Sequence, residues 1–104
     1  DTVDLSCTGA GHFRARLTGF DTPESYEPGC RAEAEAARAA TTRLRGLVAT
    51  AMTIDADLGG TDRYNRRLVA LRLDGRNVGT TLISEGLAVA YHGGRRINWC
   101  SRLG

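Results

Sequence analysis

The sequence predicts a small, mainly β domain in which short strands and one long helix form a barrel or an α+β arrangement. Two patterns support this prediction: apolar and polar residues alternate in several short segments, and residues 31–46 consist largely of the strong helix formers Ala, Glu, Arg and Leu. A length of 104 residues fits a single domain over 1–104. With 41% hydrophobic and 25% charged residues the chain is not expected to be disordered or collagen-like, and its apolar stretches are too short for a membrane span.

The N-terminal part of the chain predicts a hairpin followed by a loop. Residues 2–7 alternate in polarity, which predicts a half-buried strand and places Cys7 on its apolar face. A glycine-containing turn at 8–12 and a second alternating segment at 13–17 complete the hairpin. Two prolines and a glycine mark 21–30 as a loop.

The helix over 31–46 has acidic residues near its start and arginines near its end, which suits its dipole. Gly46 is expected to cap its C-terminus. Alternation and turn signals predict the elements that follow. They are expected as a strand at 48–54, a turn at 57–60, a strand at 68–73, a turn at 74–75, a short helix at 77–85, a strand at 87–91 and a tail at 93–104.

All 14 basic side chains are arginines, and the formal net charge is +2. Arginine clamps phosphate well because its planar fork makes bidentate contacts, but a compositional bias that also favours Ala and Gly explains most of the set. Residues 1–62 carry six arginines and ten acidic residues, whereas 63–104 carry eight arginines and two acidic residues. This split fits a cation site facing an anion site, and it also fits unrelated surface charge.

The three cysteines, Cys7, Cys30 and Cys100, leave two interpretations open. One disulfide with one buried thiol would suit an exported protein, and three reduced thiols would suit the cytosol. The chain begins at Asp1 with neither an initiator methionine nor an apolar signal segment, so we expect a mature or trimmed form.

The segment from Arg16 to Glu24 carries the first candidate chemistry. It holds an arginine on the polar face of a strand, an acid at the strand's end and a second acid after a proline. Carboxylates at such a junction suit a hard cation, which prefers oxygen ligands, and a nearby arginine can hold a phosphate against that cation. The alternative interpretation is a solvated turn with a surface ion pair.

The segment from Asp62 to Leu68 is the second candidate for a functional site, and it has three arginines beside Tyr64. Such a cluster can bind phosphate and stack a base, although an exposed basic turn would have the same composition. Strand parity predicts that Arg67 lies on the opposite side of the strand from Arg66.

Together, the two segments resemble the staphylococcal nuclease family. The resemblance begins at Asp1-Thr2-Val3, which is similar to the end of that family's Asp-Gly-Asp-Thr-Val signature, and it extends to about residue 91. Its most specific parts are Asp-Thr-Pro-Glu at 21–24, with an arginine five residues before the first acid, and the Asp-x-Tyr-x-Arg element at 62–66. It implies a five-stranded OB-type barrel with flanking helices.

The resemblance also implies a metal site and a catalytic acid. Asp1 and Asp21 would bind a Ca²⁺ ion through their carboxylates, and Thr22 would bind it through its carbonyl oxygen. Glu24 would orient the attacking water or remove its proton.

Five further residues would contact the substrate. Arg16 and Arg66 would clamp the scissile phosphate and stabilise the charge of the transition state. Arg63 and Tyr64 match positions that line the neighbouring phosphate and nucleotide, and Tyr91 matches a tyrosine of the nucleotide pocket.

We therefore expect a Ca²⁺-dependent endonuclease that hydrolyses the phosphodiester bonds of DNA and RNA by attack of water. The alternative is a catalytically inactive module of the same fold that binds nucleic acid or a protein partner, but the presence of the full acid and arginine set favours the enzyme. The cysteines and the family's habit predict export to the periplasm or the medium. We also expect a monomer and no membrane partner.

The chain departs from the family in two places. The strand that precedes the Asp-Gly-Asp element in the family is expected to be missing, and the tail at 93–104 is too short for the family's last long helix. We predict that a Cys30–Cys100 disulfide pins this tail in the place of that helix, closing a loop of roughly 70 residues that is worth ~3–5 kcal/mol. The two histidines lack the spacing of a zinc site.

Overall fold

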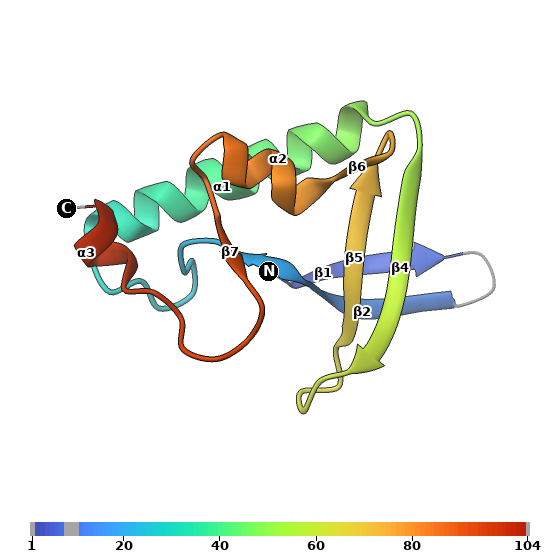
Figure 1. Cartoon of the computed structure of the whole chain (residues 1–104), viewed down its shortest axis with the longest axis horizontal. Coiled ribbons are helices and arrows are strands. Elements are labelled where there is room, and N and C mark those ends of the chain that lie inside the picture. The colour runs from blue at the N-terminus through green and yellow to red at the C-terminus, as the bar shows by residue number, and fades with distance from the viewer. Residues whose placement is uncertain (1, 8–10, 104) are drawn as a thin grey trace.

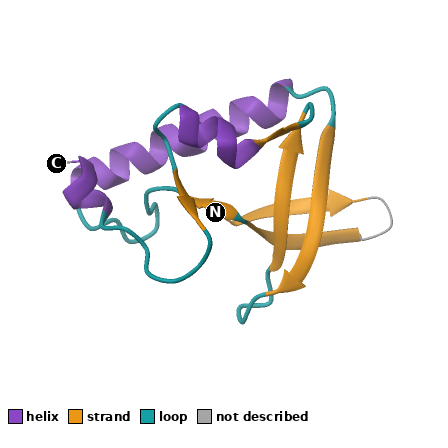
Figure 2. Cartoon of the chain, in the orientation of Figure 1, coloured by secondary structure: helices purple, strands orange, loops and turns teal. Residues whose placement is uncertain are grey.

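The computed structural model describes residues 2–7 and 11–103, which form strands packed beside three helices (Figures 1 and 2). The expected class, short strands with flanking helices, is confirmed. In chain order the elements are β1 (Thr2–Cys7), β2 (Gly11–Leu17), β3 (Gly19–Asp21), α1 (Arg31–Thr50), β4 (Ile54–Thr61), β5 (Arg67–Leu73), β6 (Arg76–Asn77), α2 (Val78–Ser84), β7 (Val89–Tyr91) and α3 (Trp99–Leu103).

The main sheet has the strand order β1-β2-β5-β4, with β6 added beside β5, and a second small sheet pairs β3 with β7. All pairs are antiparallel except β2 and β5, which run parallel. The β1–β2 hairpin crosses β4 and β5 steeply in Figure 1. Among the described residues β1 and β4 are unpaired edges, so this part of the chain forms an open sheet rather than a closed barrel.

The core fixes the short strand β3, which ends at Asp21, one of the expected cation ligands. Phe20 is 1% exposed and lies against α2 at Gly79, where an added Cβ would be 2.6 Å from the phenylalanine ring. Only glycine therefore lets the helix approach this ring so closely. Leu17, Val69 and Leu82 are also almost fully buried, and such apolar burial is the main stabilising contribution to a domain of this size.

Three of the predictions for residues 46–60 are wrong. Helix α1 does not end at Gly46 but continues to Thr50, and the predicted strand at 48–54 does not exist as such. Leu44 and Leu47 both pack in the core at helical spacing, so the alternation that follows them was accidental. A single glycine costs an exposed helix only about 1 kcal/mol, and core packing outweighs this cost.

The predicted turn at 57–60 is also wrong, because β4 runs through it to Thr61. The register of β4 against β5 shifts between Leu58 and Thr61, so the two glycines are accommodated by an irregularity within the strand.

None of the helices in the described part of the chain combines the length and the apolar character that a bilayer span requires.

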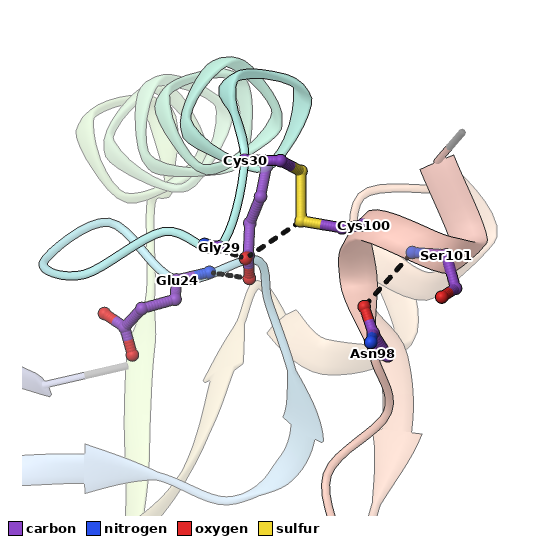
Figure 3. The surroundings of a disulfide bond; sticks show 7 residues. Glu24, Gly29, Cys30, Asn98, Cys100 and Ser101 are labelled. Atoms are coloured by element: carbon purple, nitrogen blue, oxygen red, sulfur yellow. Dashed lines mark hydrogen bonds between the residues drawn. A yellow bond between two sulfur atoms is a disulfide. The ribbon is translucent and has the colours of Figure 1, made fainter.

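A disulfide joins Cys30, which immediately precedes α1, to Cys100 in α3, as the sequence analysis expected (Figure 3). The two Cα atoms lie 6.0 Å apart, and Cys100 is 70 positions after Cys30 in the sequence. Helix α3 occupies residues for which only an irregular tail was predicted, and it contacts α1. The bond therefore fixes the C-terminal segment, residues 93–103, against the start of α1.

We expect Cys30→Ser, Cys100→Ser and the double substitution each to lower the free energy of unfolding by about 3–5 kcal/mol, because each removes the same loop closure from the unfolded chain. Urea unfolding of the three variants measures this. If the loss in the double variant equals the sum of the two single losses, the two cysteines act independently, which would contradict the disulfide.

Candidate active site

A cavity of about 800 Å³ lies between the ends of the central strands, the loop that follows β3 and one face of α1. Its polar lining includes the candidate residues that the sequence placed in two separate motifs. These are Arg16, Asp21, Thr22, Glu24 and Arg66, and they are joined by Arg96.

Asp21, the last residue of β3, is a buried carboxylate with only 3% of its surface exposed. Arg96 Nε donates a hydrogen bond of 2.9 Å to Oδ1, and Trp99 Nε1 donates one of 2.9 Å to Oδ2. A buried charge is costly unless it is paired and hydrogen-bonded, and here a guanidinium and an indole N–H meet that requirement.

The Arg96 guanidinium also contacts the carbonyl oxygen of Thr22, an expected cation ligand, and the carboxylate of Glu24, the expected catalytic acid. Nη2 lies 3.3 Å from the Thr22 carbonyl oxygen, and Nη1 lies 3.5 Å from Glu24 Oε2. Three acceptor oxygens from residues 21–24 thus converge on one positive group.

Glu24 is held in its ionised form. The backbone N–H of Tyr26 donates to Oε1 at 2.9 Å and lowers the pKa of Glu24 below its ordinary value; partial burial opposes this shift, and the charge of Arg96 adds to it. The carboxylate is therefore negative throughout the neutral pH range.

The loop between β3 and α1 is organised by Glu33, a buried residue in the first turn of α1. Its carboxylate accepts hydrogen bonds from the backbone N–H of Glu24 at 2.9 Å and from that of Gly29 at 2.8 Å. Its Oε1 also lies 3.7 Å from Cys100 Sγ, a contact with the disulfide. Glu33 thus connects the candidate catalytic loop, the helix and the C-terminal segment.

Arg66 is oriented by a tight turn that begins at Asp62. The Asp62 carboxylate accepts the backbone N–H groups of Tyr64 and Arg66, each at 2.9 Å, and its Oδ2 accepts Arg66 Nε at 2.9 Å. Asn65 takes a positive φ of 63°, which asparagine tolerates better than most residues. Desolvation would raise the pKa of Asp62, but the hydrogen bonds from Arg66 and Tyr64 outweigh it and the pKa is lowered.

Arg63, Tyr64 and Tyr91 lie outside the cavity lining. Tyr64 is 60% exposed, and the guanidinium carbons of Arg63 and Arg66 lie 5.2 and 5.3 Å from its ring centroid. Tyr91 donates a hydrogen bond of 2.7 Å to the Gly94 carbonyl oxygen. Asp1 lies outside the described residues.

The donor chemistry at residues 21–24 fits a hard cation, since it consists of carboxylate and carbonyl oxygens that already surround a positive group. Within residues 2–7 and 11–103 no group of three or more His, Cys, Asp or Glu residues is placed to hold a metal ion. Of the two carboxylate ligands that the resemblance implies, Asp21 lines this site and Asp1 lies outside the described residues; Glu24 offers a further acidic group there.

Three residues of the site were not predicted: Glu33, Arg96 and Trp99. Glu33 was interpreted only as a favourable charge near a helix N-terminus. The tail offered one usable signal, because its single tryptophan lies next to Cys100, and a tryptophan N–H that becomes buried requires an acceptor.

We expect Glu33→Gln to lower the free energy of unfolding by about 1–3 kcal/mol, since an amide replaces a charged acceptor of two backbone N–H groups with one neutral oxygen and a donor. Thermal and urea unfolding measure the loss. Glu35→Gln is the control, because Glu35 is exposed and its ion pair with Arg31 is long, at 3.5 Å; it should change the free energy by less than about 0.5 kcal/mol. Equal losses in both variants would contradict the role assigned to Glu33.

A comparison with protein families matches residues 14–99 to the model described as staphylococcal nuclease homologue. The matched range covers most of the chain and contains Arg16, Arg66 and the loop with the two acids. No curated protein matches the chain.

Proposed function

Since the chain belongs to the staphylococcal nuclease family, we propose that it hydrolyses phosphodiester bonds in DNA and RNA by attack of water, with the help of a bound Ca²⁺ ion. One observation carries this proposal. Arg16 and Arg66 come from different motifs, yet both line one cavity together with the acids of residues 21–24. A phosphate that enters this cavity meets positive groups and oxygen ligands at once.

The parallel pairing of β2 with β5 brings the two arginines together. Arg16 lies opposite Leu68 in the register, two residues after Arg66. Both guanidinium groups are proposed to contact the scissile phosphate and to stabilise the charge that develops on its oxygens, which is usually the largest catalytic contribution. The Asp62 carboxylate holds Arg66 in place before substrate binds.

Glu24 is proposed to orient the attacking water. A general base works best when its pKa is near the operating pH, whereas hydrogen bonding keeps the pKa of Glu24 below the ordinary value of a glutamate. This supports a role in which the carboxylate accepts a hydrogen bond from the water and aligns it with the phosphorus.

Asp21, the Thr22 carbonyl and Asp1 are the residues proposed to hold Ca²⁺. When bound, the ion would supply positive charge beside the phosphate. Arg63, Tyr64 and Tyr91 are proposed to line the neighbouring phosphate and nucleotide, and the exposed ring of Tyr64 suits stacking with a base. Export is proposed as well, and the disulfide supports it because such bonds persist in oxidising compartments.

We expect Ca²⁺-dependent cleavage of plasmid and single-stranded DNA that stops in chelator, and Arg66→Ala should lower kcat/KM by about 10²–10³-fold because one donor to the transition state is lost. Gel assays of cleavage measure both. Arg67→Ala is the matched control: it removes the same charge one residue later, from a side chain outside the cavity lining that donates to the Gly59 carbonyl. Nucleic acid that binds but stays intact would instead support the inactive binding module.

We expect Glu24→Gln to lower kcat by about 10²–10³-fold, and the loss should be constant between about pH 5 and 8. The pH dependence follows from the direction of the pKa shift. Because the pKa of Glu24 is lowered, its carboxylate is already ionised in this pH range, and raising the pH further does not change its charge. Rate profiles of the variant and the wild type test this. Glu27→Gln, an exposed acid of the same loop, is the control. A loss that grows tenfold per pH unit over this range would show that Glu24 titrates there as a base.

A further inference from the structure

We infer that Arg96 is a tethered competitor of the cation: its guanidinium holds the same oxygens that Ca²⁺ needs, so the ion binds only by displacing it. This inference rests on the proposed function, because it concerns the cation site of that reaction. Arg96 was not part of the site that the sequence predicted, and it comes from the C-terminal segment rather than from either motif.

The overlap is direct. Arg96 makes three contacts within residues 21–24: Nε to Asp21 Oδ1 at 2.9 Å, Nη2 to the Thr22 carbonyl at 3.3 Å, and Nη1 to Glu24 Oε2 at 3.5 Å. Two of these oxygens belong to the proposed Ca²⁺ ligands. The other oxygen of Asp21, Oδ2, is also engaged, by the indole N–H of Trp99.

The C-terminal segment is anchored on both sides of this contact. Trp99 is 4% exposed, and Cys100 is bonded to Cys30 at the start of α1. Asn98 Oδ1 accepts the backbone N–H of Ser101 at 3.1 Å within the same segment (Figure 3). These contacts hold the backbone beside the site, so Arg96 stays at a high effective concentration near its acceptors.

The side chain of Arg96 can still leave. Its side chain is 42% exposed, whereas that of Asp21 is 4% exposed, so the guanidinium has access to water while Trp99 and the disulfide keep the backbone in place. Charged hydrogen bonds are about twice as strong as neutral ones, and a cation must replace them before it binds. By reciprocity, a bound cation weakens the hold on Arg96 to the same extent.

Calcium titration of Arg96→Ala and Arg96→Gln, followed by calorimetry and by the fluorescence of Trp99, tests this inference. Trp99 is the single tryptophan of the chain and contacts Asp21, so its emission reports on the site without a cleavage assay. We expect both variants to bind Ca²⁺ at least about tenfold more tightly than the wild type, which corresponds to about 1.4 kcal/mol. Arg95→Ala, which removes an identical charge from the neighbouring exposed residue, should change the affinity by less than about threefold.

Equal or weaker Ca²⁺ binding in both Arg96 variants would overturn the inference and leave the proposed nuclease function standing. A gain in Arg95→Ala as large as that in Arg96→Ala would also overturn it, because the effect would then be general charge rather than competition. If neither the wild type nor any variant binds Ca²⁺ and the wild type does not cleave, the proposed function fails and the inference with it. Thermal unfolding in chelator confirms that each variant is folded. If Arg96→Ala is not folded, the test relies on Arg96→Gln.

Discussion

The buried carboxylate of Asp21 is the group on which the rest of the site depends. A negative charge that is 3% exposed requires compensation from its surroundings, and both of its oxygens receive it from the C-terminal segment. The two donors lie 75 and 78 residues further along the chain. The last part of the sequence is therefore a structural requirement of the loop that carries the candidate acids.

Asp21 is also fixed from its apolar side. It follows Phe20, whose ring is buried against the glycine of α2, and β3 pairs with β7 along its whole length. A strand of three residues has little stability of its own, so its position comes from the ring on one side and the polar contacts on the other. The same arrangement gives the neighbouring Thr22 carbonyl a defined direction.

Local patterns predicted the parts of the molecule in which neighbours in sequence decide the structure. Strand β5 alternates strictly, with Val69, Leu71 and Leu73 buried, and the sequence showed it. The end of α1 was missed because tertiary packing of Leu47 outweighed the glycine signal. The five cavity-lining candidates were found through two motifs and the family resemblance. The contacts of Arg96 and Trp99 were not found, because nothing in a sequence states which buried acid a distant arginine will meet.

The disulfide has a consequence for the integrity of the chain after it is cut. Every peptide bond from Cys30 to Cys100 lies inside the covalent ring that the bond closes. A protease that cuts an exposed turn in this range, such as the one around Tyr64, therefore produces two pieces that stay joined, whereas a cut in the loop before Cys30 releases the N-terminal hairpin from any covalent link. Arg66, which lies just before β5, and the segment that reaches Asp21 would therefore remain one molecule after such a nick.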